Sequence, residues 1–150
     1  MTQGKLFALS LLGSAAMVAS VAIANPVSEG GRKFNLTLTG ANEVPPTTET
    51  GTGTATITVN PGQLRLCWEI TTTGFDLATE SLTGAHIHPG FAGANGPILI
   101  PVTATLNGTS TGCVDVSRDV ADAIRKAPQA YYLNIHTNIF PGGAIRDQLG

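Results

Sequence analysis

The sequence predicts an all-β fold: a Greek-key-like β-sandwich or a flattened barrel of about eight short strands with one short helix. Three observations support this. Apolar and polar residues alternate in many short segments, which is the period of a strand with one buried face. Gly, Pro and Asn residues separate these segments at short intervals. Charged residues make up only 12% of the chain, and frequent Thr, Gly and Val suit a small exported β protein better than a helical one.

The first half of the chain contains four segments of this kind. In the first, Phe34, Leu36 and Leu38 fall on one face. The Asn-Pro-Gly sequence at 60–62 predicts a hairpin between the second and the third. The segments are 32–39, 52–59, 64–70 and 82–88.

The second half contains the remaining strands and the helix. We expect a short strand at 97–102, two strands on either side of a turn at Gly108, and strands at 131–137 and 144–149. The helix is predicted over 117–126, because Ser117 can cap it and Pro128 stops it. Val120, Ala123 and Ile124 would form its apolar face.

Residues 1–24 have the pattern of a secretory signal. Lys5 precedes a run of apolar and small residues, which ends in a small-x-small sequence at Ala24. The alternative is a retained membrane anchor. With the signal removed, we expect a flexible leader at 25–31 and one domain at 32–150, secreted or periplasmic and not bound to a membrane. The formal net charge of −2 argues against nucleic acid as a partner.

The chain has two cysteines, Cys67 and Cys113, and both lie in the predicted exported part. An even number of cysteines in an oxidising compartment favours one disulfide. Two buried free thiols are the alternative. Neither cysteine is near a histidine in the sequence, so no Cys₂His₂ zinc site is indicated.

The strongest functional signal comes from the histidines. The chain has three, and His86 and His88 are two residues apart in one predicted strand. Residues at that spacing share a face, with Cα atoms about 6.6 Å apart. His136 lies on the polar face of the strand at 131–137. If the two strands are neighbours, three imidazoles can meet outside the apolar interior.

Three imidazoles suit copper, zinc, nickel or iron, and copper is favoured by its intrinsic affinity, with zinc or iron less favoured. The alternative is that the histidines only form hydrogen bonds at a strand edge. Two further side chains could support a metal site. Glu43 could orient an imidazole or accept backbone N–H bonds in a turn. Tyr132 shares the face of His136 and could pack against the site, or only add aromatic surface.

Three stretches resemble the chordin-type domain known as CHRD: LTGANEVPP at 38–46, GAHIH at 84–88, and NIHT at 134–137 running into FPGGAIR at 140–146. The resemblance covers nearly the whole of the predicted domain. It implies an extracytoplasmic β-sandwich but says little about activity. In animals, such domains occur in secreted antagonists of growth factors. Ala144 stands where the family often has an acidic residue, so that carboxylate is absent here.

The GAHIH stretch also resembles the Gly-x-His-x-His strand of copper–zinc superoxide dismutases. That resemblance implies copper ligands at His86 and His88, with His136 as a third. It makes Arg146 an analogue of the arginine that attracts the anionic substrate. Arg146 could instead form an ion pair with Glu43 or Asp147. Further His and Asp ligands for zinc are missing, so a two-metal site is not expected.

Together these observations predict an exported CHRD protein with a surface three-histidine metal site. Copper is the expected ion, and superoxide the expected small anionic substrate if the protein is an enzyme. The competing hypothesis is a non-catalytic extracellular module that binds a protein or matrix partner through its loops.

Overall fold

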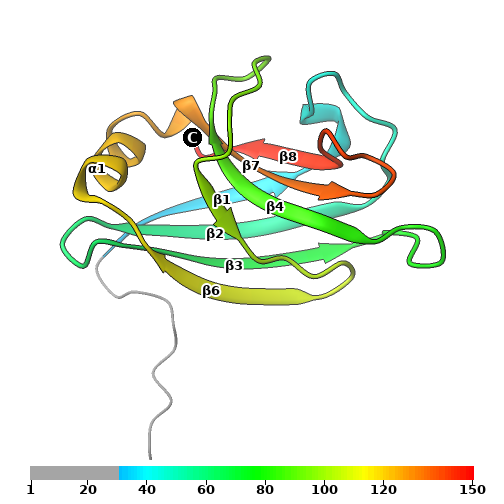
Figure 1. The fold of residues 1–150 in the computed structure, drawn as a ribbon, viewed down its shortest axis with the longest axis horizontal. Coiled ribbons are helices and arrows are strands. Elements are labelled where there is room, and N and C mark those ends of the chain that lie inside the picture. The colour runs from blue at the N-terminus through cyan, green and yellow to red at the C-terminus, as the bar shows by residue number, and fades with distance from the viewer. Residues whose placement is uncertain (1–30) are drawn as a thin grey trace, which may run out of the picture.

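Two four-stranded antiparallel sheets pack face to face in the computed structural model (Figure 1). It describes residues 31–150, so the predicted signal and the predicted leader up to residue 30 lie outside the described residues. The first sheet has the order β1-β2-β3-β6 and the second β5-β4-β7-β8. The strands are β1 (Arg32–Leu38), β2 (Thr52–Asn60), β3 (Arg65–Thr73), β4 (Leu82–Pro89), β5 (Ile100–Val102), β6 (Thr109–Asp115), β7 (Tyr131–Thr137) and β8 (Ile145–Gln148). The predicted all-β sandwich is confirmed, and the sheets do not close into a barrel.

The core lies between the two sheets, where the alternation predicts it. Leu36 and Ile70 from the first sheet and Ile87 and Ile135 from the second are 0–3% exposed. The outer face of the second sheet is also covered, because Tyr132 and other polar residues of β7 are buried under loops. This covered outer face, unlike that of the first sheet, carries all three histidines.

One helix, α1 (Arg118–Lys126), lies at one end of the sandwich (Figure 1). Ser117 caps it as predicted, since its hydroxyl accepts a hydrogen bond from the Val120 N–H. The buried residues of the helix are Ala121 and Ile124, so Ala121 takes the place expected for Ala123.

The segment between β4 and β6 differs most from the prediction. Only Ile100–Val102 is a strand there, and 103–107 forms none. Side chains of the first sheet bind its backbone instead: the Thr105 carbonyl accepts from the Thr72 hydroxyl, and the Thr103 carbonyl accepts from the Ser110 hydroxyl. These groups are therefore satisfied without a ladder partner.

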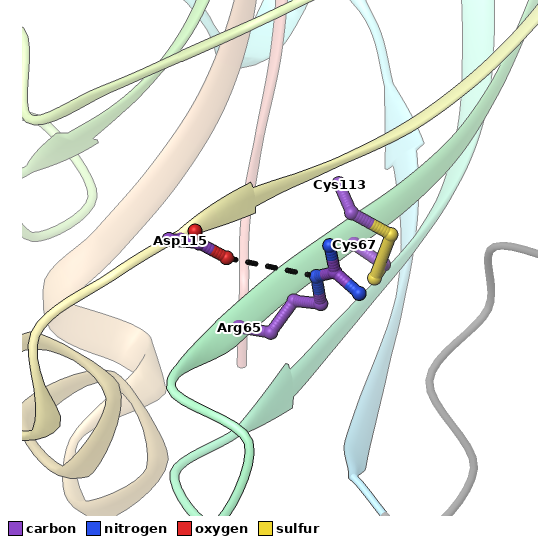
Figure 2. The surroundings of a disulfide bond; sticks show 4 residues. All are labelled: Arg65, Cys67, Cys113 and Asp115. Atoms are coloured by element: carbon purple, nitrogen blue, oxygen red, sulfur yellow. Dashed lines mark ion pairs between the residues drawn. A yellow bond between two sulfur atoms is a disulfide. The ribbon is translucent and has the colours of Figure 1, made fainter.

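Cys67 and Cys113 form the predicted disulfide, which joins β3 directly to β6 (Figure 2). Two positions along the same pair of strands, Arg65 and Asp115 form an ion pair at 3.7 Å. Both of these charged side chains are well exposed, so the ion pair adds little stability.

Replacing both cysteines with serine should lower the free energy of unfolding by about 4 kcal/mol. The reason is that the bridge spans 46 positions. A cross-link that closes a loop of this size lowers the conformational entropy of the unfolded chain, which raises its free energy by about 4 kcal/mol. Urea unfolding of the oxidised wild type and the double variant would measure the difference. Arg65→Ala is the control on the same strands, with an expected loss below about 1 kcal/mol. A loss of less than 1 kcal/mol in the cysteine variant would contradict the prediction.

Candidate metal centre

Three histidines meet on the outer face of the second sheet. β4 carries His86 and His88 and pairs with β7, which carries His136. One ring nitrogen from each histidine lies within 4.8 Å of the other two. The ring centroids are 5.0 Å apart for His86 and His136 and 5.6 Å for His86 and His88. The two strands are neighbours, which is the condition that the sequence analysis set, and their pairing places the three imidazoles together.

A glycine makes room for one of these rings. Gly84 lies directly opposite His136 in the strand ladder, and the His86 ring packs over it. A Cβ atom at position 84 would lie 2.7 Å from Cε1 of His86. Any larger residue there would displace the His86 ring from its present position.

Two backbone carbonyls determine the tautomers of two histidines. Nδ1 of His88 is 3.0 Å from the Gly96 carbonyl, and Nδ1 of His136 is 3.1 Å from the Pro141 carbonyl. A carbonyl can only accept, so each Nδ1 carries the proton and each Nε2 keeps a free lone pair. This arrangement is typical of metal-ligating histidines, whose other nitrogen is held by a carbonyl or carboxylate.

One ring nitrogen of each histidine is shielded from solvent. Nδ1 of His86 and Nε2 of His88 and His136 are buried and have no hydrogen-bond partner. His88 is 5% exposed, while the other two rings are half-buried. The histidines therefore point away from the core as predicted, but loops cover them. The site is more recessed than the solvent-open surface site that the sequence suggests.

Burial also sets the protonation of the cluster. It lowers the pKa of His86, and the neighbouring His136 and His88 lower it further. Burial likewise lowers the pKa of His136, although the hydrogen bond to Pro141 acts in the opposite direction. Both rings are therefore neutral at pH 7, which is the form that binds metal ions.

Tyr132 and Arg146 form a stack with His88. The rings of His88 and Tyr132 are parallel, with centroids 4.9 Å apart. Cζ of Arg146 lies 3.3 Å from the centroid of the Tyr132 ring. Because β7 lies between β4 and β8, His88 and Arg146 approach the tyrosine from opposite sides. Tyr132 thus packs against the histidine cluster, as one of the two sequence interpretations proposes.

Arg146 is buried, with 1% of its surface exposed. Its guanidinium donates hydrogen bonds to the Phe91 and Ala94 carbonyls and to the Asn95 side chain, all in the loop after β4. A fourth bond goes to Gln148. Within the described residues it forms no ion pair. Arg146 thus holds this loop in place through its hydrogen bonds. That its charge attracts an anion stays a prediction.

Glu43 follows a short 3₁₀ helix, η1 (Gly40–Asn42), and is 4% exposed. Its carboxyl lies against the backbone of Gly143, where a Cβ atom would be 2.5 Å from Oε1. Burial raises its pKa to about 7, although the Arg146 charge and hydrogen bonds with Asn134 and Val44 oppose this. Backbone carbonyls, not Glu43, hold the Nδ1 atoms of His88 and His136.

A family model for the CHRD domain matches residues 34–149. The chain belongs to the CHRD domain family. Searches of curated proteins and of solved structures gave no match. The disulfide fits the extracytoplasmic setting expected of a CHRD domain. Between residues 31 and 150, no helix is long and apolar enough to cross a bilayer.

Three residues of the CHRD domain's site were not predicted from its sequence. Asn134 is 3% exposed and lies directly opposite His86 in the ladder. Its place on the polar face of β7, two residues before His136, was a usable signal. Gly96 and Pro141 contribute only backbone carbonyls, and no residue type marks that role.

Glu43→Gln should change how the stability of the CHRD domain depends on pH. The folded-state pKa of about 7 lies above the ordinary glutamate value of 4.5, so between these values the folded state binds more protons than the unfolded state. The Glu43 carboxyl contributes fully to the free energy of unfolding below about pH 4.5. This contribution falls by up to about 3 kcal/mol as pH rises through 7.

Urea unfolding from pH 4.5 to 8 would measure this effect as the difference between the wild type and Glu43→Gln. The wild type should lose stability relative to the variant as pH rises. Glu69→Gln, which removes an exposed carboxyl on the other sheet, is the matched control. Parallel stability curves for the wild type and Glu43→Gln would contradict the prediction.

Proposed function

We propose that this CHRD domain binds one transition-metal ion through His86, His88 and His136, with copper as the preferred ion. The observation that carries the proposal concerns buried polar atoms without a hydrogen-bond partner. Within residues 31–150 there are five, and three are ring nitrogens of these histidines, one from each. Buried polar groups are almost always satisfied, so this concentration supports a ligand that accepts the three lone pairs.

The donor set fits such an ion. Nitrogens that bind one metal ion at about 2.0–2.1 Å lie about 3.5 Å apart, and the present nitrogens lie within 4.8 Å of one another. Binding therefore requires only a small inward shift of the rings. Three imidazoles without thiolate or carboxylate suit copper, zinc, nickel or iron, and affinity favours copper over zinc or iron.

Superoxide dismutation in the periplasm or outside the cell is the finer part of the proposal. Copper at this site would supply one-electron redox chemistry. Three protein ligands leave a coordination position free, and the His-x-His strand resembles that of copper–zinc superoxide dismutases. The predicted signal at residues 1–24 supports export.

A non-catalytic binding module is the second candidate. Three large apolar side chains in loops near the cluster favour it: Phe91 is 60%, Ile98 58% and Ile139 52% exposed. Such side chains suit contact with a protein or matrix partner.

Analysis of the protein, purified after export by its host, would test both candidates. We expect one equivalent of copper per chain and superoxide removal that His86→Ala abolishes. Stoichiometric copper without activity would reject the enzyme and leave the metal site. Failure to retain copper, zinc, nickel or iron would reject the metal site and favour the binding module.

A further inference from the structure

Two more buried atoms in the described residues have no hydrogen-bond partner: Oε1 of Glu43 and Oδ1 of Asn134. Asn134 lies opposite His86 in the strand ladder, and directly opposite residues have Cβ atoms about 4.5–5.5 Å apart. The Asn134 side chain in turn forms a hydrogen bond with Glu43. The buried Glu43 carboxyl is therefore linked to the histidine cluster through the Asn134 amide. The described residues show no direct contact between this carboxyl and an imidazole.

We propose that Glu43, held by Asn134, is the proton-exchanging group of the metal centre: it loses its proton when a divalent metal ion binds, and its carboxylate compensates the charge of the ion. This inference rests on the proposed metal site. In the exchange, the O–H bond of the carboxyl breaks, the proton passes to the solvent and the electron pair stays on the carboxylate. No oxidant or reductant takes part.

The charges around the cluster give the reason. Imidazole ligands bring no negative charge to a divalent ion, and Arg146 already places a buried positive charge beside Tyr132. The two positive charges of a divalent ion would raise the electrostatic free energy of this buried region unless a negative charge develops nearby. Glu43, which is linked to the cluster through Asn134, can supply it.

The metal-free domain favours the protonated carboxyl. Arg146 on β8 is the charged group that acts on Glu43, and burial outweighs its effect. The other titratable groups of the cluster are Tyr132 and the three histidines on β7 and β4. Burial lowers the pKa of His86 and of His136 below the usual value of about 6.5, so more than half of each is already neutral at pH 6.5.

Calorimetric titration of the full chain with Zn(II) would test the inference, because zinc is redox-inert. Titrations at pH 6.5 in two buffers with different ionisation enthalpies give the number of protons released. We expect the wild type to release about 0.8 proton more than Glu43→Gln, and this difference to disappear at pH 8.5. Zinc affinity should fall about tenfold in the variant. Glu69→Gln, on the other sheet, should behave like the wild type.

The outcomes separate the two proposals. If the wild type binds no zinc or copper, the metal site itself fails. If the wild type and Glu43→Gln both bind zinc and release equal numbers of protons, only the role of Glu43 fails. If the variant does not fold, the wild type still decides: release near zero at pH 6.5, or release that does not fall between pH 6.5 and 8.5, overturns the inference.

Discussion

Replacing His86 with alanine should abolish the stabilisation by copper without destabilising the metal-free domain. The Nδ1 atom of His86 is buried and makes no hydrogen bond, and its ring is desolvated beside two other imidazoles. Its removal should therefore cost the metal-free fold little. Loss of one of three ligands should weaken copper binding at least 100-fold, which removes about 2.7 kcal/mol of stabilisation at saturating metal.

Thermal unfolding with and without one equivalent of Cu(II) would measure both effects. Thr83→Ala, at an exposed position of β4, is the control and should keep the copper-dependent rise in Tm. His86→Ala should show no copper-dependent rise in Tm. An unchanged rise in His86→Ala would mean that copper binds elsewhere. A large loss of stability without metal would mean that His86 is a structural residue.

The arrangement of the histidines could be predicted because it depends on local periodicity. In β4, Ala85 and Ile87 are apolar and face the core, so His86 and His88 must face outward. The same argument applies to Ile135 and His136 in β7. Pairing of the two strands then brings the rings together. That pairing was a condition of the prediction, because period-2 alternation gives the face of a residue but not the neighbour of a strand.

The cover over the site could not be predicted, because it depends on loops without a period. The loop at 90–96 binds His88 and Tyr132 through the backbone of Gly96, and its own backbone is held by Arg146. Backbone contacts of this kind leave no trace in residue type. The burial of Arg146 was missed for the same reason: a charged residue in a short final strand is exposed in most proteins.

Arg146→Lys should loosen this loop and weaken the metal site. A lysine ammonium is a point charge with three donors, so it cannot lie flat on Tyr132 and also reproduce the bonds to Phe91, Ala94 and Asn95. Buried carbonyls without donors cost about 1–3 kcal/mol each, and we expect a total loss of about 3–5 kcal/mol. The Gly96 carbonyl should then hold His88 less firmly, which lowers copper affinity about tenfold.

Urea unfolding and Cu(II) titration of the same sample would separate the two effects of Arg146→Lys. Arg125→Lys, at an exposed position of α1, should leave both quantities unchanged. Hydrogen exchange at Gly96 adds a local measurement, because its N–H donates to the Tyr132 hydroxyl at 3.2 Å and should exchange faster once the loop is released. Wild-type copper affinity together with unchanged exchange at Gly96 would show that the loop keeps its position without the guanidinium. In that case residue 146 would contribute to the site through its positive charge, which lysine preserves, and not through its hydrogen bonds to the loop. This is the contribution that attraction of an anion requires.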